Sequence, residues 1–253
     1  MQRDVREAWE REQQLLGLAR DTSDDRFAAE GLAVLAVEPT VRIVVLPGDP
    51  AAQPVGAAEP NSVLPRVVKV GSMSLPIQHT IRGTASGYVA YADASEGNQW
   101  ASFIALHWHG GVDFYLGTEG GRRWPAETGP RVVFLKRSVA WAWGAFDLQR
   151  QAIEQYSIAG PYRAIIGVAN TAGTALGNLG VGWAEPGSPM SFGRPEAVEP
   201  RVLLTEDLAE WPDADGIEAL ALRFGARLDL AFGGPGRRHL DHQGPNAGKY
   251  VAQ

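Results

Sequence analysis

The residues most suited to chemistry lie in one short segment, 106–113, with the sequence Leu-His-Trp-His-Gly-Gly-Val-Asp. Side chains two positions apart on a strand share a face, so His107 and His109 could bind one metal ion, with Asp113 as an oxygen ligand. Such ligands suit the metals that activate water or dioxygen. One functional alternative is therefore a metal-dependent hydrolase or dioxygenase.

The same segment also fits a β-hairpin. Two apolar strands meet at His109-Gly110 or at Gly110-Gly111, residues that tolerate the positive φ of a tight turn. In that arrangement His109 lies at the tip of the turn and does not share a face with His107. We favour the hairpin, so we assign no catalytic residue and no cofactor, and we interpret the chain as leaning away from an enzyme.

Two further segments carry weaker candidates. His239, Asp241 and His242 form a polar cluster, which we expect at the surface of an irregular tail over 235–253. Two histidines three positions apart chelate a metal only on a helix or a suitable loop. The run Gly173–Gly182 lacks the ending of a P-loop and the glycine order of a dinucleotide fingerprint. We interpret it as a strand, a turn and a strand, and keep binding of a small ligand or nucleotide as an alternative.

Aromatic residues suggest a role in contacts. The chain has eight tryptophans, and most of them belong in the core. Those in polar or Gly- and Pro-flanked segments are typical of protein contacts, because an exposed indole adds a large apolar surface. The interaction candidates are Trp100, Trp108, Trp124 and Trp211.

Hydrophobic periodicity predicts the elements that must position these residues. Apolar residues at three- and four-residue intervals predict helices, and short apolar runs bounded by Gly and Pro predict strands. Asp215 and Glu218 predict a capping box at the start of the last helix. Helices are predicted over 3–20, over 138–157 and from Asp215 to the Gly233-Gly234-Pro235 stop, and strands over 31–37, 41–46, 87–91, 100–107, 112–116, 131–135, 162–168 and 175–183.

These elements predict an α+β fold. Its centre is a mainly antiparallel sheet, on which an N-terminal, a central and a C-terminal helix pack. A chain of 253 residues is still short enough for one core, so we expect a single domain over 1–253. Within it, 1–31 forms an N-terminal helical segment and 235–253 the irregular tail.

Composition excludes several classes of function. The chain has no cysteine, which rules out disulfides and thiolate chemistry. Its net charge is −6, and the acid-rich stretch 185–218 repels phosphate, so we expect no nucleic-acid binding by this chain alone. No apolar run approaches the ~20 residues of a bilayer span. We therefore expect a cytoplasmic protein without a membrane contact, and the Arg-, Ala- and Gly-rich composition suggests a bacterial source.

Taken in order, several segments resemble the region that follows the Schlafen-type AlbA_2 putative DNA-binding domain in bacterial proteins. The resemblance rests on short motifs spread over most of the chain, at 3–20, 33–39, 87–91, 106–113, 160–168, 201–205, 228–233 and 240–244. We expect no AlbA_2 domain ahead of Arg3. The DNA-binding and ATP-related roles of that domain are therefore not carried over.

These observations favour a non-enzymatic module. We expect a protein-interaction or sensor module that acts with a partner chain or as a homo-oligomer. The metal-dependent enzyme at His107, His109 and Asp113, and a small-ligand or nucleotide-binding domain near Gly173–Gly182, are its alternatives. The residues alone identify neither the partner nor the ligand.

Overall fold

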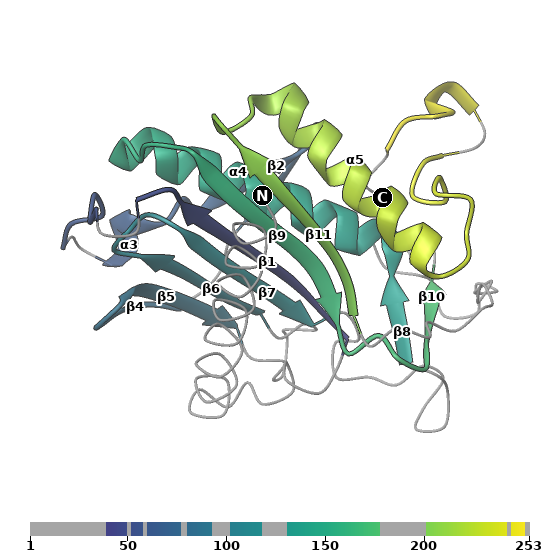
Figure 1. Cartoon of the computed structure of the whole chain (residues 1–253), viewed down its shortest axis with the longest axis horizontal. Helices are drawn as coiled ribbons and strands as arrows, with labels where there is room; N and C mark the ends of the chain where they lie inside the picture. The colour runs from purple at the N-terminus through teal and green to yellow at the C-terminus, as the bar shows by residue number, and fades with distance from the viewer. Residues whose placement is uncertain are drawn as a thin grey trace, which may run out of the picture.

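An antiparallel sheet dominates the computed structural model shown in Figure 1. The structure describes residues 39–49, 52–57, 60–76, 80–92, 102–117, 131–177, 201–241 and 244–250. Seven strands lie in the order β11-β9-β1-β7-β6-β5-β4, and each neighbouring pair is antiparallel. Their bounds are β1 Thr40–Pro47, β4 Thr80–Thr84, β5 Gly87–Ala92, β6 Ser102–His107, β7 Val112–Gly117, β9 Tyr162–Ala169 and β11 Arg201–Leu208.

Two small strand pairs and the helices complete the described fold. The pair β2–β3 is an antiparallel hairpin, and β8 pairs with β10 in parallel. The remaining bounds are α3 Pro60–Val63, β2 Val67–Val70, β3 Met73–Pro76, β8 Arg131–Phe134, α4 Leu135–Tyr156, β10 Thr174–Gly177, α5 Ala214–Ala231 and the 3₁₀ turn η1 Gly244–Asn246. Among the described helices, none combines the length and apolar character needed to cross a bilayer.

The large sheet has two different faces, because alternate residues of a strand point to opposite sides. Val41, Ile43 and Val45 of β1 are buried in the hydrophobic core. This core lies between the sheet and the helices, where α4 contacts β1 and β7 and α5 contacts β11 (Figure 1). Arg42 and Val44 point to the side opposite the two helices, which we call the open face because neither α4 nor α5 lies on it. Val44 and Tyr115 on this face are nevertheless buried.

The longest helix, α4, is held in place by a buried carboxylate. Asp147 accepts a hydrogen bond from the backbone N–H of Lys69 in β2, at 2.7 Å. Its two oxygens also accept from the Arg150 guanidinium and from Gln151 Nε2, at 2.8 Å for the closest contact of each. Because these donors satisfy a buried charge, Asp147 fixes the β2–β3 hairpin against α4.

The last helix begins two residues earlier than the sequence indicated. Its N-cap is Asp213, which is extended and accepts from the Gly216 backbone N–H at 2.9 Å. The predicted cap at Asp215 is therefore wrong, and Asp215 lies in the first turn, where its charge favours the helix dipole. The predicted end is correct, because the helix stops at Ala231 and Gly233 has a positive φ of 69°.

The α+β prediction with a mainly antiparallel sheet is confirmed. The central and C-terminal helices are α4 and α5, so the structure shows two of the three predicted helices. The predicted N-terminal helix over 3–20, the helical segment 1–31 and the strand over 31–37 lie outside the described residues. The single-domain assignment for 1–253 stays a prediction.

Candidate functional site

The segment 106–113 forms the predicted β-hairpin between β6 and β7. The His107 N–H donates to the Gly111 carbonyl at 3.0 Å, and the Gly110 N–H donates to the His107 carbonyl at 2.8 Å. The turn therefore has Trp108 and His109 at its centre. Within this segment, Gly110 has a positive φ of 86°. The predicted turn at His109-Gly110 or Gly110-Gly111 is therefore one or two residues later in the chain than the observed turn.

Both histidines lie on the same side of this hairpin, which corrects one expectation. The rings of His107 and His109 stack with centroids 5.0 Å apart and planes inclined by 14°. His109 folds back because its Nδ1 accepts the Gly111 N–H at 3.1 Å. His107 Nε2 lies 2.9 Å from a carboxylate oxygen of Asp113. The turn tip therefore does not separate the two imidazoles.

Each imidazole has one ring nitrogen in a contact within the hairpin. His107 Nε2 contacts Asp113, and His109 Nδ1 accepts from the Gly111 N–H. Burial lowers the pKa of His109 below the usual 6.5, the nearby charge of His107 lowers it further, and Asp113 opposes both. Within the described ranges, no three His, Asp or Glu side chains are arranged to hold a metal ion. The metal-dependent alternative stays a prediction, without a described ligand set.

The residues of the second polar cluster, His239, Asp241 and His242, do not share one environment. His239 is only 2% exposed, because its ring packs against the backbone of α5 at Gly225. The expectation of a surface location is therefore wrong for His239. Asp241 forms an ion pair with Lys136 of α4 at 2.8 Å, and His242 lies outside the described residues. These contacts attach the tail to α4 and α5.

The glycine-rich run is only partly described. A turn closed by Thr174, whose N–H donates to Thr171 at 3.0 Å, leads into β10, and Gly173 takes a φ of 70°. β10 then pairs in parallel with β8. Residues 178–182 lie outside the described residues, so ligand binding at this run stays a prediction.

The two described interaction candidates, Trp108 and Trp211, pack against the core. Trp108 donates its indole N–H to the Ala85 carbonyl at 2.8 Å and meets the Tyr88 ring edge-on at 5.2 Å. Trp211 donates to the Phe146 carbonyl at 3.2 Å. Each is half-buried, so the bonded indole fixes local structure. Trp100 and Trp124 lie outside the described residues.

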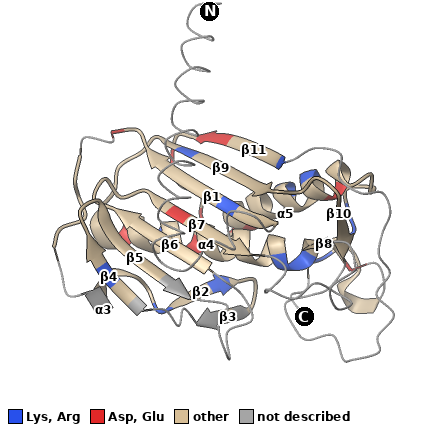
Figure 2. Ribbon diagram, turned by 90° about the horizontal axis from the view of Figure 1, so that it is seen from below, with Lys and Arg blue, Asp and Glu red and all other residues tan. Residues whose placement is uncertain are grey.

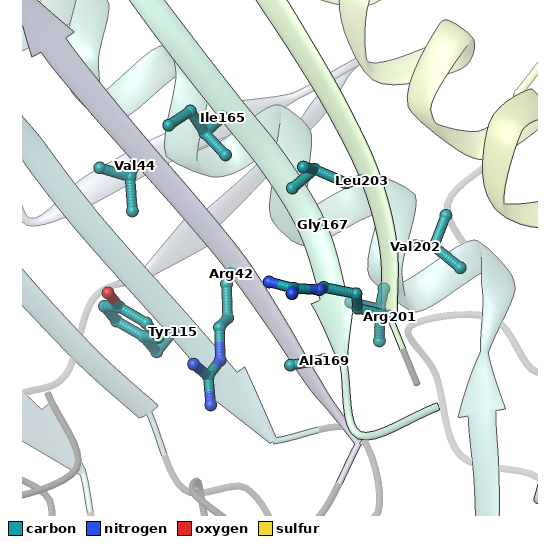
Figure 3. A pocket seen from close by; sticks show the side chains of 10 residues that line it. Arg42, Val44, Tyr115, Ile165, Gly167, Ala169, Arg201, Val202 and Leu203 are labelled. Atoms are coloured by element: carbon teal, nitrogen blue, oxygen red, sulfur yellow. The ribbon is translucent and has the colours of Figure 1, made fainter. Parts of the chain in front are cut away.

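Sequence patterns did not reveal a hollow on the open face. It lies over β1, β9 and β11, beside β7, and has a volume of about 100 Å³ (Figure 3). Val44, Ile165 and Leu203 form its apolar floor. Val44 and Ile165 are buried, whereas Leu203 is 37% exposed. This volume is below the roughly 300–1,000 Å³ of usual small-molecule sites, so the hollow can enclose only part of a ligand.

A glycine makes the hollow possible. Gly167 of β9 lies opposite Arg42 on one side and opposite Leu203 of β11 on the other. A Cβ at Gly167 would lie 2.6 Å from the Val202 carbonyl oxygen and 3.3 Å from Leu203 Cδ1. The missing side chain therefore allows β11 to lie close to β9 and leaves space over the strand.

Cationic groups border this space. Arg42 Cζ lies 5.7 Å from the centre of the Tyr115 ring, in the range of a cation–π contact. Figure 3 shows the Arg201 side chain crossing β9 toward β1. Within the described part of the chain, Arg201 has no ion pair, whereas Asp207 on the same face is held by Arg163 at 2.7 and 2.9 Å. The hollow therefore has two arginines at its rim and an apolar floor.

No family model, curated protein or solved structure matches the chain. The candidate site is therefore defined by its own geometry. Its best-formed part is the hollow around Gly167, and the hairpin pair of His107 and Asp113 lies farther along the same face. In register, Asp113 lies opposite Val44 and is two residues from Tyr115, which places both features on one surface.

Proposed function

We propose that this chain is a non-enzymatic sensor module that binds a small organic carboxylate with an apolar body in the hollow on the open face. The observation that carries the proposal is the combination of Arg42 and Arg201 with the floor around Gly167. Arginine matches a carboxylate by paired N–H donors. The aliphatic floor removes the apolar body of the ligand from water.

The groups around the hollow favour binding over catalysis. An arginine does not release its proton at neutral pH. General acid–base catalysis needs a group that titrates near the working pH. His107 and Asp113 contact each other at 2.9 Å in the hairpin and do not line the hollow.

A sensor passes its state to another molecule. The resemblance to the region after AlbA_2 supports a module that works beside a second chain, and the homo-oligomer is the alternative form of that proposal. We further propose that the protein acts in the bacterial cytoplasm. A co-purification from the native host, with cell fractionation, tests both statements.

The ligand proposal is tested with a matched pair of probes. Octanoate and octanamide share an alkyl chain and differ in charge, so only octanoate gains from the arginines. We expect octanoate to raise the melting temperature, because a ligand that binds only the folded state stabilises it. Calorimetry on Arg201→Gln should show at least a tenfold weaker affinity, since a charge-assisted hydrogen bond contributes about 1.5–3 kcal/mol.

The control variant is Arg227→Gln, which removes an exposed arginine on α5. It should bind octanoate as the wild type does. Equal binding of octanoate and octanamide would show an apolar site without anion recognition. Absence of binding to both probes, and to the aromatic carboxylate 2-naphthoate, would refute the ligand proposal.

A further inference from the structure

β11 is an edge strand. Within the described residues it pairs only with β9, and it lies at the end of the seven-stranded order. It is eight residues long, which is long for an exposed edge, and proteins usually protect such edges because they can pair with another strand. Leu203 and Asp207 on its open face are 37% and 68% exposed, respectively.

The charges along this edge are arranged with opposite signs at its two ends. Arg201 begins the strand, and Glu206 and Asp207 lie near its end. Figure 2 shows the two ends of β11 as a blue and a red segment. An antiparallel neighbour with the same sequence would bring the basic end of each strand beside the acidic end of the other.

The register of such a pair follows from the side-chain pattern. In an antiparallel pair, residues directly opposite each other share a face. A two-fold axis at Leu204 places Arg201 opposite Asp207 of the second copy, and repeats this ion pair on the other side of the axis. An axis at Leu203 or at Thr205 would place an uncharged residue opposite Arg201.

We infer that β11 pairs with β11 of a second copy of this chain about a two-fold axis at Leu204. The pairing would join two seven-stranded sheets into one and form two ion pairs between Arg201 and Asp207. The Arg201 side chain, which crosses β9 toward β1 in the single chain (Figure 3), has to turn outward to form this pair. Asp207 already accepts two hydrogen bonds from Arg163, yet its side chain remains 68% exposed. A carboxylate can accept more than two hydrogen bonds, so a second arginine can approach.

This dimer is a specific form of the homo-oligomer in the proposed function. It rests on that part of the proposal and not on the ligand. One pair of edge strands buries less surface than the usual ~1,600 Å² of a stable interface. The dimer should therefore dissociate on dilution. Because no carboxylate is needed, its failure would leave ligand binding in the hollow untouched.

The test uses two charge-reversal variants in sedimentation velocity. Arg201→Asp alone should be monomeric, because its pairs become two facing acids. Asp207→Arg alone should also be monomeric, because its pairs become two facing arginines. An equal mixture of the two variants should dimerise, since each of the two facing pairs then joins an acid and an arginine. Arg227→Asp on α5 is the control and should dimerise as the wild type does.

Melting curves first establish that each variant is folded. A wild type that stays monomeric at every concentration overturns the inference. A variant that still forms its own dimer, or a mixture of folded variants that stays monomeric, overturns the register at Leu204. Dimerisation of the mixture but of neither variant alone supports it.

Discussion

Replacing Gly167 by Ala tests the close approach of β9 and β11 beneath the hollow. The new Cβ would lie 2.6 Å from the Val202 carbonyl oxygen, a distance that real Cβ contacts do not show. The contacted atom belongs to the backbone of a paired strand, so it cannot rotate away as a flexible side chain would. β11 has to shift, and the strand pair that carries Leu203 is strained.

The magnitude follows from two opposing effects. Inserting a methyl group into a packed site costs about 1–3 kcal/mol. Replacing Gly by Ala recovers about 0.5–1 kcal/mol, because the unfolded chain loses freedom. We therefore expect Gly167→Ala to lower the free energy of unfolding by about 0.5–2 kcal/mol, and to weaken octanoate binding because the methyl group occupies the hollow.

Urea unfolding followed by tryptophan fluorescence measures this change. The control is Gly56→Ala, since a Cβ at Gly56 would meet no atom within 4 Å. That control should be as stable as the wild type or slightly more stable. A Gly167→Ala variant that is at least as stable as the wild type would show that β9 and β11 are not closely apposed at this point.

Two further predictions concern the supports of the site. Asp147→Ala should lower the free energy of unfolding by about 3 kcal/mol, because it leaves buried donors of α4 and β2 unsatisfied. Glu154→Ala, which removes an ion pair on a 62% exposed side chain, should change it by less than about 0.5 kcal/mol in the same urea assay. The pKa of His109 in the folded protein is below 6.5, so a neutral His109 favours the folded state over the unfolded state. This stabilisation is complete above pH 6.5 and is lost as the pH falls toward the folded pKa. As the pH is lowered below 6.5, the free energy of unfolding of His109→Asn should fall less steeply than that of the wild type. Identical slopes for the two proteins would contradict a lowered pKa at His109.

Local patterns in the sequence predicted much of the fold. The alternation around β6 and β7, with the glycines between them, identified the hairpin, because strand period and turn chemistry are encoded within a few residues. The cap of α5 was misplaced at Asp215. Asp213 also precedes the helix, and a choice between two nearby acids depends on which backbone N–H each can reach.

Local patterns in the sequence did not predict the hollow. The hollow combines Arg42, Gly167 and Arg201 from three strands that are neighbours in space only, and no local spacing connects them. The burial of His239 likewise depends on a glycine in another element, Gly225. Such contacts are set by strand order and helix packing, which periodicity does not encode.

The central claim, that the hollow binds a carboxylate, is tested most directly by an NMR titration of the labelled protein with octanoate. The backbone amide signals of Ile165, Gly167 and Leu203 should shift in proportion to the ligand bound, while those of α4 stay in place. The same titration of Arg201→Gln should need a far higher concentration of octanoate. Shifts confined to the 106–113 hairpin, or no shifts at all, would contradict the claim.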